Sequence, residues 1–201
     1  MTQLRTRLLN LYLGLVLFGL SMGLMIVADL GLDPWDVFHQ GIAERSGIRF
    51  GWVVILVGAV VLLAWIPLRQ RPGIGTLSNV VVVGLAVDAA LAVLPEPEHL
   101  GVRTAMLVAG IVLNGVATGL YVGAGLGPGP RDGLMTGLAR RGRSIRVVRT
   151  SIEVAVLAVG WLLGGAVGVG TVLFAVTIGP LVHFFIPRLT VGSPEPALEI
   201  A

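Results

Sequence analysis

Six apolar segments separated by short polar turns make up most of this chain. They cover residues 8–28, 50–67, 75–94, 103–123, 147–163 and 170–187. Each is about 17 to 21 residues long, which is the length that a helix needs to cross the hydrocarbon core of a bilayer. With 55% hydrophobic and 12% charged residues, the chain lacks the polar surface of a soluble globule. The sequence therefore predicts an all-α, polytopic membrane protein with six transmembrane helices.

The second half of the chain repeats the first at an offset of 96 residues. Residues 19–43 and 115–139 share ten identities in 25 positions. The repeated motif pairs Leu30, Gly31, Pro34 and Asp36 with Leu126, Gly127, Pro130 and Asp132. We therefore divide the single membrane domain into two three-span repeats, residues 1–99 and 100–201. Repeats of this kind usually place the working site where the two copies meet.

The distribution of charge predicts the orientation of the spans. All 14 basic residues are arginine, and six spans with a cytoplasmic N-terminus place eleven of them inside and only Arg45, Arg49 and Arg103 outside. This follows the positive-inside rule. We expect both termini to be cytoplasmic. The basic charge thus reflects topology, and we expect no nucleic-acid partner.

Because each repeat contains three spans, the second copy must cross the bilayer in the direction opposite to the first. The two repeats are then inverted, with the Asp36 motif toward the outer face and the Asp132 motif toward the inner face. Inverted repeats are frequent in secondary transporters, although they also occur in membrane proteins that transport nothing.

A short helix is expected after the first span of each repeat. Asp33 fits the N-cap and Pro34 the first helical position, so that Asp36 could reach back to the N-cap amide. Gly129 and Pro130 repeat this start in the second copy. The two helices, about residues 34–45 and 130–141, are too short and too polar to span the bilayer. We expect them to lie in the interface or to be re-entrant.

The repeated motifs supply the candidates for substrate binding or ion coupling. Asp36 and Asp132 are the only acidic residues matched across the halves. They serve either as helix caps or as a site for a cation, a proton or the substrate. The other motif candidates are Gly31, Pro34, Gly127, Pro130 and Arg131.

Two more ionisable candidates lie inside apolar segments. Asp88 aligns with His183 when one gap is allowed between the copies. A charge within a span is costly, so each is either hydrogen-bonded near a helix end or part of a proton or substrate site. Arg149 and Glu153 are four residues apart and are expected to form a structural ion pair.

Small and aromatic residues suggest how the spans pack. The pairs Gly19/Gly23 and Gly115/Gly119 allow helices to approach closely, either within one chain or between copies in a homo-oligomer. Trp52, Trp65 and Trp161 lie near span ends, as interfacial anchors do.

No enzyme pattern is visible in the sequence. The chain has no cysteine, and its three histidines show no metal-ligand spacing. We expect no catalytic residues, no metal and no cofactor.

The paired Gly-x-x-Pro-x-Asp motifs, in about 200 residues with six spans, resemble the bacterial YczE/YyaS/YitT group of integral membrane proteins, and the YczE branch most of all. The resemblance covers nearly the whole chain. It implies a bacterial inner-membrane location and names no substrate.

Three functions remain open from the sequence, and the weakest of them is a passive channel. The first is a small-molecule transporter or permease that exposes a midplane site alternately to either side, with the lipid bilayer and an unknown small-molecule substrate as its partners. The alternative is a non-transporting membrane scaffold or accessory protein.

Overall fold

The computed structural model describes residues 2–192 and consists of helices joined by short turns. The eight helices of this region are α1 (Thr2–Ala28), α2 (Pro34–Ser46), α3 (Phe50–Trp65), α4 (Ile74–Val93), α5 (Leu100–Gly123), α6 (Pro130–Ala139), α7 (Ile145–Leu162) and α8 (Val169–Leu189). No strand occurs within these residues. The prediction of an all-α fold is confirmed.

Five of these helices are long and apolar enough to cross a membrane, namely α1, α3, α4, α5 and α8. They coincide with five of the six predicted spans to within a few residues, except that α1 begins earlier, at Thr2. The remaining segment forms α7, which has 18 residues but carries Arg146, Arg149 and Glu153. Large apolar side chains are exposed on the outer faces of the apolar helices, such as Val60 at 64% and Val176 at 68%. Such a surface is stable in lipid and unfavourable in water.

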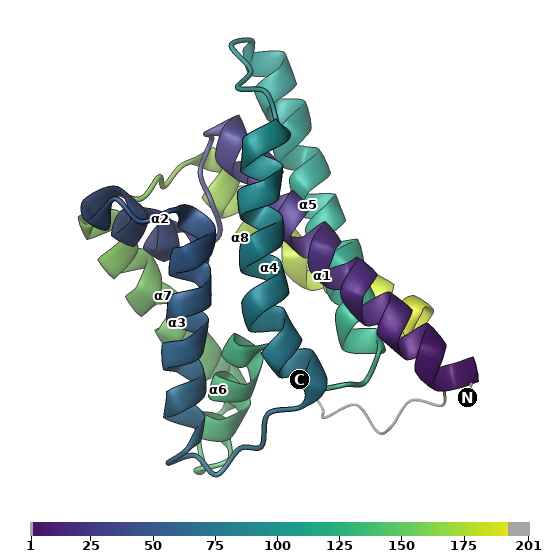
Figure 1. Cartoon of the computed structure of the whole chain (residues 1–201). Coiled ribbons are helices and arrows are strands. Elements are labelled where there is room, and N and C mark those ends of the chain that lie inside the picture. Colours follow the sequence, from purple (N-terminus) through teal and green to yellow (C-terminus); the bar gives the residue numbers. More distant parts are fainter. Residues whose placement is uncertain (1, 193–201) are drawn as a thin grey trace.

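The helices form two bundles that lie next to each other in Figure 1. The first contains α1, α4, α5 and α8, where α1 packs on α4 and α5, and α5 packs on α8. The second contains α2, α3, α6 and α7, where α2 packs on α7 and α6 packs on α3. The bundles are joined mainly through the contact between α3 and α4. Each bundle therefore takes helices from both halves of the chain.

The glycine pairs pack helices within the chain. A Cβ atom on Gly19 would lie 2.5 Å from the Cβ of Ala86 on α4, and one on Gly115 would lie 2.9 Å from the Cβ of Leu181 on α8. These glycines let α1 approach α4 and α5 approach α8, as predicted for packing inside the monomer.

Most helix contacts of the first half have an equivalent in the second half. The α1–α4 contact matches α5–α8, α2–α7 matches α6–α3, and α2–α3 matches α6–α7. Two pairs depart from this rule, because α4 packs on α3 and also touches α6, whereas α8 has no comparable contact with α7 or α2 in the region that the structure describes. The two halves thus differ mainly at the α3–α4 pair.

The two short motif helices form where the sequence predicts them. α2 begins at Pro34 after the N-cap Asp33 and ends at Ser46, and α6 begins at Pro130 after the N-cap Gly129. α6 ends at Ala139, two residues before the predicted end, because the chain turns at residues 140–143. The Asp33 side chain accepts hydrogen bonds from the backbone N–H groups of Trp35 and Asp36, which confirms the predicted cap.

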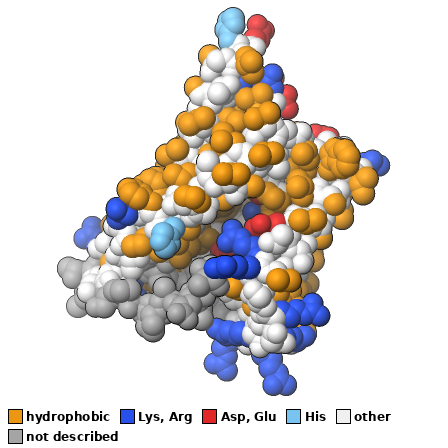
Figure 2. Space-filling view, turned by 180° about the vertical axis from the view of Figure 1, so that it is seen from behind, with side chains coloured by type: hydrophobic (Ala, Val, Ile, Leu, Met, Phe, Trp, Pro, Cys, Tyr) orange, Lys and Arg blue, Asp and Glu red, His pale blue; other side chains and the backbone are white. Residues whose placement is uncertain are grey.

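The charged side chains are distributed unevenly over the surface. Figure 2 shows a group of arginines at the lower end of the molecule and acidic side chains near the upper end. The turns before α4 and after α6 both lie at the lower end, and Arg141 donates to the carbonyl of Pro67 at 2.8 Å. The asymmetry has the pattern expected of a protein whose arginine-rich loops lie on one side of a membrane.

Candidate functional site

The two motif turns are held by equivalent backbone hydrogen bonds to the opposite half of the chain. The N–H of Gly170 donates to Leu30 O at 2.7 Å, and the N–H of Gly75 donates to Leu126 O at 2.8 Å. Gly31 has φ +107° and Gly127 has φ +122°, and a Cβ on either would lie within 3 Å of an atom of the opposite half. Both the backbone conformation and the close approach require glycine. Each motif turn therefore docks on the start of the last helix of the other half.

Arg131, at the start of α6, reaches the start of α2 and connects the two motifs. Its Nη1 lies 3.7 Å from Asp33 Oδ1 and its Nη2 lies 3.5 Å from Asp36 Oδ1. The guanidinium also lies over the Trp35 ring, 5.1 Å from the ring centroid. Arg131 and Trp35 occupy equivalent positions in the two copies, so the site is built from both motifs but is chemically asymmetric.

Asp36 is fully buried and does not cap its own helix. Its Oδ1 lies 3.1 Å from His39 Nδ1, one turn along α2, while Oδ2 is buried without a hydrogen-bond partner in the described region. The expectation that Asp36 reaches back to the N-cap amide was wrong, because His39 and Arg131 take up the carboxylate instead. A buried carboxylate oxygen without a donor is rare in folded proteins and marks a place where a proton or a ligand can bind.

Burial governs the protonation of this cluster. It raises the pKa of Asp33 from 3.8 to about 7, with a further increase from the charge of Asp36 and a decrease from Arg131. Burial likewise raises the pKa of Asp36, although Arg131 opposes the shift. The pKa of His39 is lowered to about 3, by burial first and then by Arg131. His39 is therefore neutral at pH 7, with its Nδ1 within hydrogen-bond distance of Asp36, while the carboxyl group of Asp33 can exchange a proton near neutral pH.

The raised pKa of Asp33 predicts how stability depends on pH. A carboxyl group with a higher pKa in the folded state stabilises the fold below its unfolded pKa, and this contribution is lost as the pH rises through the folded value. We expect the unfolding free energy of the wild type, relative to Asp33→Asn, to fall by roughly 2–4 kcal/mol between about pH 4 and about pH 8. Asparagine caps a helix as well as aspartate does, so the substitution leaves the start of α2 intact. Detergent-based unfolding across this pH range provides the measurement, and a difference that is flat or rises with pH would contradict the assignment.

A small cavity of about 30 Å³ lies beside the charged cluster. It is lined by polar and charged side chains from α2, α4 and α6 together with valine, glycine and proline residues; the lining is Trp35, His39, Val57, Gly58, Val61, Asn79, Val80, Pro130 and Arg131. The indole N–H of Trp35 is buried and has no acceptor in the described region. The cavity has room for about one water-sized group. It lies where the two bundles meet, because its lining comes from α2, α3 and α6 together with α4.

Asp132 lies next to this cavity and has a different partner from Asp36. The hydroxyl of Tyr121 on α5 donates to its Oδ2 at 3.1 Å. A Cβ atom placed on Gly129 would lie 3.2 Å from this carboxylate oxygen and 3.8 Å from the side-chain nitrogen of Asn79. The two repeated aspartates therefore have different partners, since Asp36 contacts a histidine and Asp132 a tyrosine.

The remaining predicted residues lie outside the cluster. Asp88 Oδ1 accepts a hydrogen bond from the backbone N–H of Gly51 at 2.7 Å, at the contact between α3 and α4. His183 is exposed on α8. The predicted pair of Arg149 and Glu153 is formed, with a distance of 2.9 Å. Pro130 lines the cavity, whereas Gly31, Pro34 and Gly127 shape the motif turns.

Several residues of the site were not predicted from the sequence. His39 follows Asp36 by three positions on one helix, a spacing that could have identified it. Trp65 was expected to be an interfacial anchor, but it is 2% exposed and donates its indole N–H to Pro130 O at 3.0 Å. Tyr121 carries no sequence signal, because its role depends on how distant helices meet.

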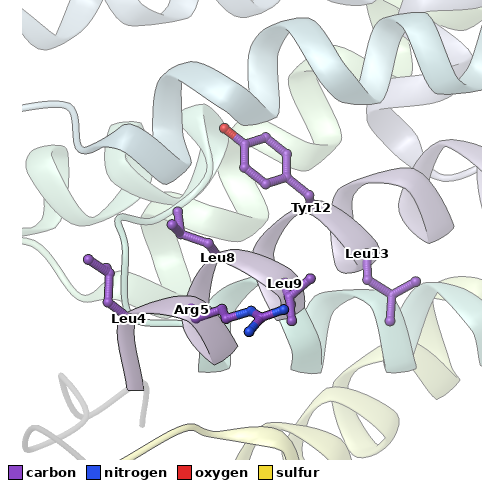
Figure 3. A pocket seen from close by; sticks show the side chains of 6 residues that line it. All are labelled: Leu4, Arg5, Leu8, Leu9, Tyr12 and Leu13. Carbon is purple, nitrogen blue, oxygen red and sulfur yellow. The ribbon is translucent and has the colours of Figure 1, made fainter. Parts of the chain in front are cut away.

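A larger surface hollow lies elsewhere and has a different chemistry. A groove of about 580 Å³ follows the first half of α1 and is lined by Leu4, Arg5, Leu8, Leu9, Tyr12 and Leu13. Figure 3 shows these side chains along one helix, with Tyr12 and Arg5 as the only polar ones. This groove is almost entirely apolar, in contrast to the charged cluster at the start of α2. No cluster of potential metal ligands occurs among the described residues.

Comparison with known proteins gives the family. A model of a family of unknown function (DUF6198) matches residues 5–187. An uncharacterized protein of Haemophilus influenzae is 44% identical over 177 residues, which cover 88% of this chain and 81% of the relative. The uncharacterized membrane protein YczE of Bacillus subtilis is 33% identical over 180 residues, covering 88% of this chain and 84% of YczE.

The resemblance inferred from the motifs is confirmed by these relatives. The uncharacterized protein YyaS of Bacillus subtilis is 26% identical over 182 residues, covering 87% of this chain and 90% of YyaS, so YczE is the more similar of the two. No solved structure matches the chain significantly. The apolar helices and the membrane-protein relative agree on the membrane class. The chain therefore belongs to the DUF6198 family of proteins, whose function is unknown.

Proposed function

We propose that this protein is a carrier for a small solute, built from two inverted three-span repeats in the cytoplasmic membrane of a bacterium, with both termini in the cytoplasm. α7 is the sixth span, and α2 and α6 are re-entrant helices whose first turns meet at the substrate site. Alternating exposure of this site to the two sides of the membrane carries the solute across.

The observation that carries the proposal is the buried charged cluster at the meeting point of the two motifs. Arg131 of one copy reaches Asp33 and Asp36 of the other across the boundary between the repeats. Ionisable groups at such depth are expensive and are retained mainly where they bind ions or substrates. Structural ion pairs alone would not need the adjoining cavity or an unpartnered oxygen on Asp36.

α7 carries three charged residues and can still span the bilayer within this arrangement. Arg149 and Glu153 neutralise each other at 2.9 Å, and Arg146 lies in the first turn, at the predicted cytoplasmic surface. Pairing and proximity to the headgroups both lower the cost of inserting charged side chains.

The difference between the two halves supports alternating access. α3 and α4 are in close contact, because a Cβ on Gly51 would lie 2.0 Å from Gly84 O. In the second half, Gly179 is the equivalent of Gly84, and a Cβ added to Gly179 would meet nothing within 4 Å. Accordingly, α7 lies apart from α8. Exchange of these two arrangements would close the α7–α8 side and open the α3–α4 side. The present conformation corresponds to a site reached from the predicted cytoplasmic side.

Transport by purified protein in proteoliposomes tests the proposal. We expect saturable uptake of at least one solute from a panel of radiolabelled organic acids, amines and sugars. Flux that rises linearly with concentration would indicate a channel. The absence of flux together with a reproducibly co-purifying protein would support the scaffold alternative and contradict the carrier.

The repeated aspartates provide a sharper version of this test. We expect Asp36→Asn and Asp132→Asn to lower transport by roughly tenfold or more, which corresponds to about 1.4 kcal/mol, because each removes the carboxylate of one of the two repeated motifs. Asp29→Asn is the matched control, since the Asp29 side chain is 70% exposed and pairs with Arg103 outside the cluster. Normal uptake by both motif variants, with normal membrane insertion, would remove these aspartates from the mechanism.

A further inference from the structure

We propose that the cavity between Trp35 and Arg131 binds the carboxylate of a small organic anion and that one proton is bound with it. The inference rests on the proposed carrier function and names the substrate class of the same site. The proton is taken up by the carboxyl groups that pair with Arg131 in the absence of substrate.

Arg131 is more exposed than the two aspartates with which it pairs. The Arg131 side chain is 25% exposed, whereas those of Asp33 and Asp36 are 5% and 0% exposed. A solute that enters the cavity therefore meets the guanidinium first. Arg131 has five N–H donors, and its contacts with the two carboxylates are long, at 3.7 and 3.5 Å. Donors remain for a ligand, and a guanidinium pairs readily with a carboxylate.

A second donor at the cavity has no partner. The indole N–H of Trp35 is buried without an acceptor in the described region, and the Trp35 ring lines the cavity. An indole N–H can only donate, so its natural partner is an oxygen of the ligand. The first turns of α2 and α6 also contribute the positive ends of their helix dipoles. These features favour an oxyanion over a cation.

Charge balance requires a proton to accompany the anion. Around Arg131 lie Asp33, Asp36 and the neutral His39 of α2, Asp132 of α6, and Tyr121 of α5. On α7, Arg149 and Glu153 pair with each other, and the cavity-lining residues of α3 and α4 do not titrate. An added carboxylate would leave excess negative charge in a poorly solvated site. A proton from water that binds an oxygen of Asp36 removes this excess and frees Arg131 to pair with the ligand.

The dimensions of the cavity limit the solute. About 30 Å³ accommodates a group the size of one water, so a carboxylate enters only when the lining side chains move apart, and the rest of the solute must lie outside this cavity. The apolar part of the lining comes from Val57, Gly58 and Val80. A small acid with a short apolar body suits these surroundings better than a polyanion.

Ligand-dependent thermal unfolding of the purified full-length protein in lipid nanodiscs tests this inference. The probes are acetate, lactate, succinate and benzoate, with methylammonium as the cationic comparison and acetamide as the neutral one. We expect at least one carboxylate to raise the unfolding temperature in a saturable manner. Its apparent affinity should be about tenfold weaker at about pH 8 than at about pH 6, because uptake of one proton is coupled to binding.

Variants separate this site from other anion sites. Arg131→Gln should abolish the protection by the carboxylate, Arg131→Lys should retain part of it, and Asp36→Asn should reduce its dependence on pH. Arg140→Gln is the matched control, because Arg140 is exposed at the end of the same helix. If Arg131→Gln does not fold, the lysine variant and the pH dependence of the wild type still decide the question.

Three results would overturn the inference. These are protection by methylammonium with none by any carboxylate, equal affinity at both pH values, and unchanged carboxylate protection in Arg131→Gln. Failure of the carrier function would appear differently, as carboxylate protection that depends on Arg131 without any flux in proteoliposomes.

Discussion

Replacement of Gly160 by alanine should lower the unfolding free energy of the protein by about 1–3 kcal/mol, the cost of overpacking a close contact. Gly160 lies on α7 against α2, and an added Cβ would lie 2.5 Å from both the Cα and the N of Phe38. Because these atoms are backbone, no side-chain rotation relieves the clash, and α2 must move away from α7. Reversible unfolding in mixed detergent micelles measures the change.

Gly101 provides the control for this substitution. It also lies in a helix, α5, and a Cβ added there meets nothing within 4 Å. We expect Gly101→Ala to be neutral or to stabilise the protein by up to about 1 kcal/mol, as alanine does in helices. If both variants show the same stability as the wild type, α2 is not held against α7 in the way the structure describes.

Removal of both carboxylates from the cluster should destabilise the protein more than removal of Arg131. An arginine cannot lose its proton, so Asp33→Asn/Asp36→Asn leaves a charge without a partner. In Arg131→Gln the two carboxyl groups, whose pKa values are already raised by burial, take up protons and become neutral. Loss of one partner from a buried pair costs about 3–5 kcal/mol.

We expect the double variant to lose about 2–3 kcal/mol of unfolding free energy. This loss is below the range for a fully buried pair, because the Arg131 side chain is 25% exposed. Arg131→Gln should cost about 1 kcal/mol or less, since neutral carboxyl groups tolerate burial. Arg149→Gln serves as the comparison for an exposed i,i+4 pair, which contributes about 0.3–0.5 kcal/mol. Unfolding at neutral pH gives all three values. A larger loss in Arg131→Gln than in the double variant would contradict this view of the cluster.

The helices and motif turns were predictable because they depend on local chemistry. The length of the apolar segments identified the five candidate spans, and Asp33 and Pro34 specified the start of α2. Gly31 and Gly127 were identified by repetition, and the structure supplies the reason, which is a positive φ together with a close approach to the opposite half.

The partners inside the site could not be predicted in the same way. Arg131 was a candidate, but its contacts with Asp33 and Asp36 join residues almost 100 positions apart and depend on how the two bundles meet. Trp65 shows the same limit. The position of Trp65 at a span end suggested an interfacial anchor. Instead its ring packs against α6 at Gly133, where a Cβ added to the glycine would lie 1.9 Å from a ring carbon. Only glycine leaves room for the ring.

Asp88 and His183 show that positions aligned between the two copies need not have equivalent surroundings. Asp88 accepts a hydrogen bond at the α3–α4 contact, whereas His183 is exposed on α8. The sequence aligns these residues but does not specify which helices pack against them.

The membrane sidedness of the two motif helices tests the proposed inverted repeats most directly. The chain has no cysteine, so single cysteines can be introduced without a background of native thiols. Ser46→Cys at the end of α2 and Arg143→Cys in the turn after α6 both replace exposed residues. With a membrane-impermeant maleimide, Ser46→Cys should be labelled in intact cells, and Arg143→Cys only after the membrane is opened. Labelling of both positions from the same side would contradict the inverted arrangement and the carrier mechanism that depends on it.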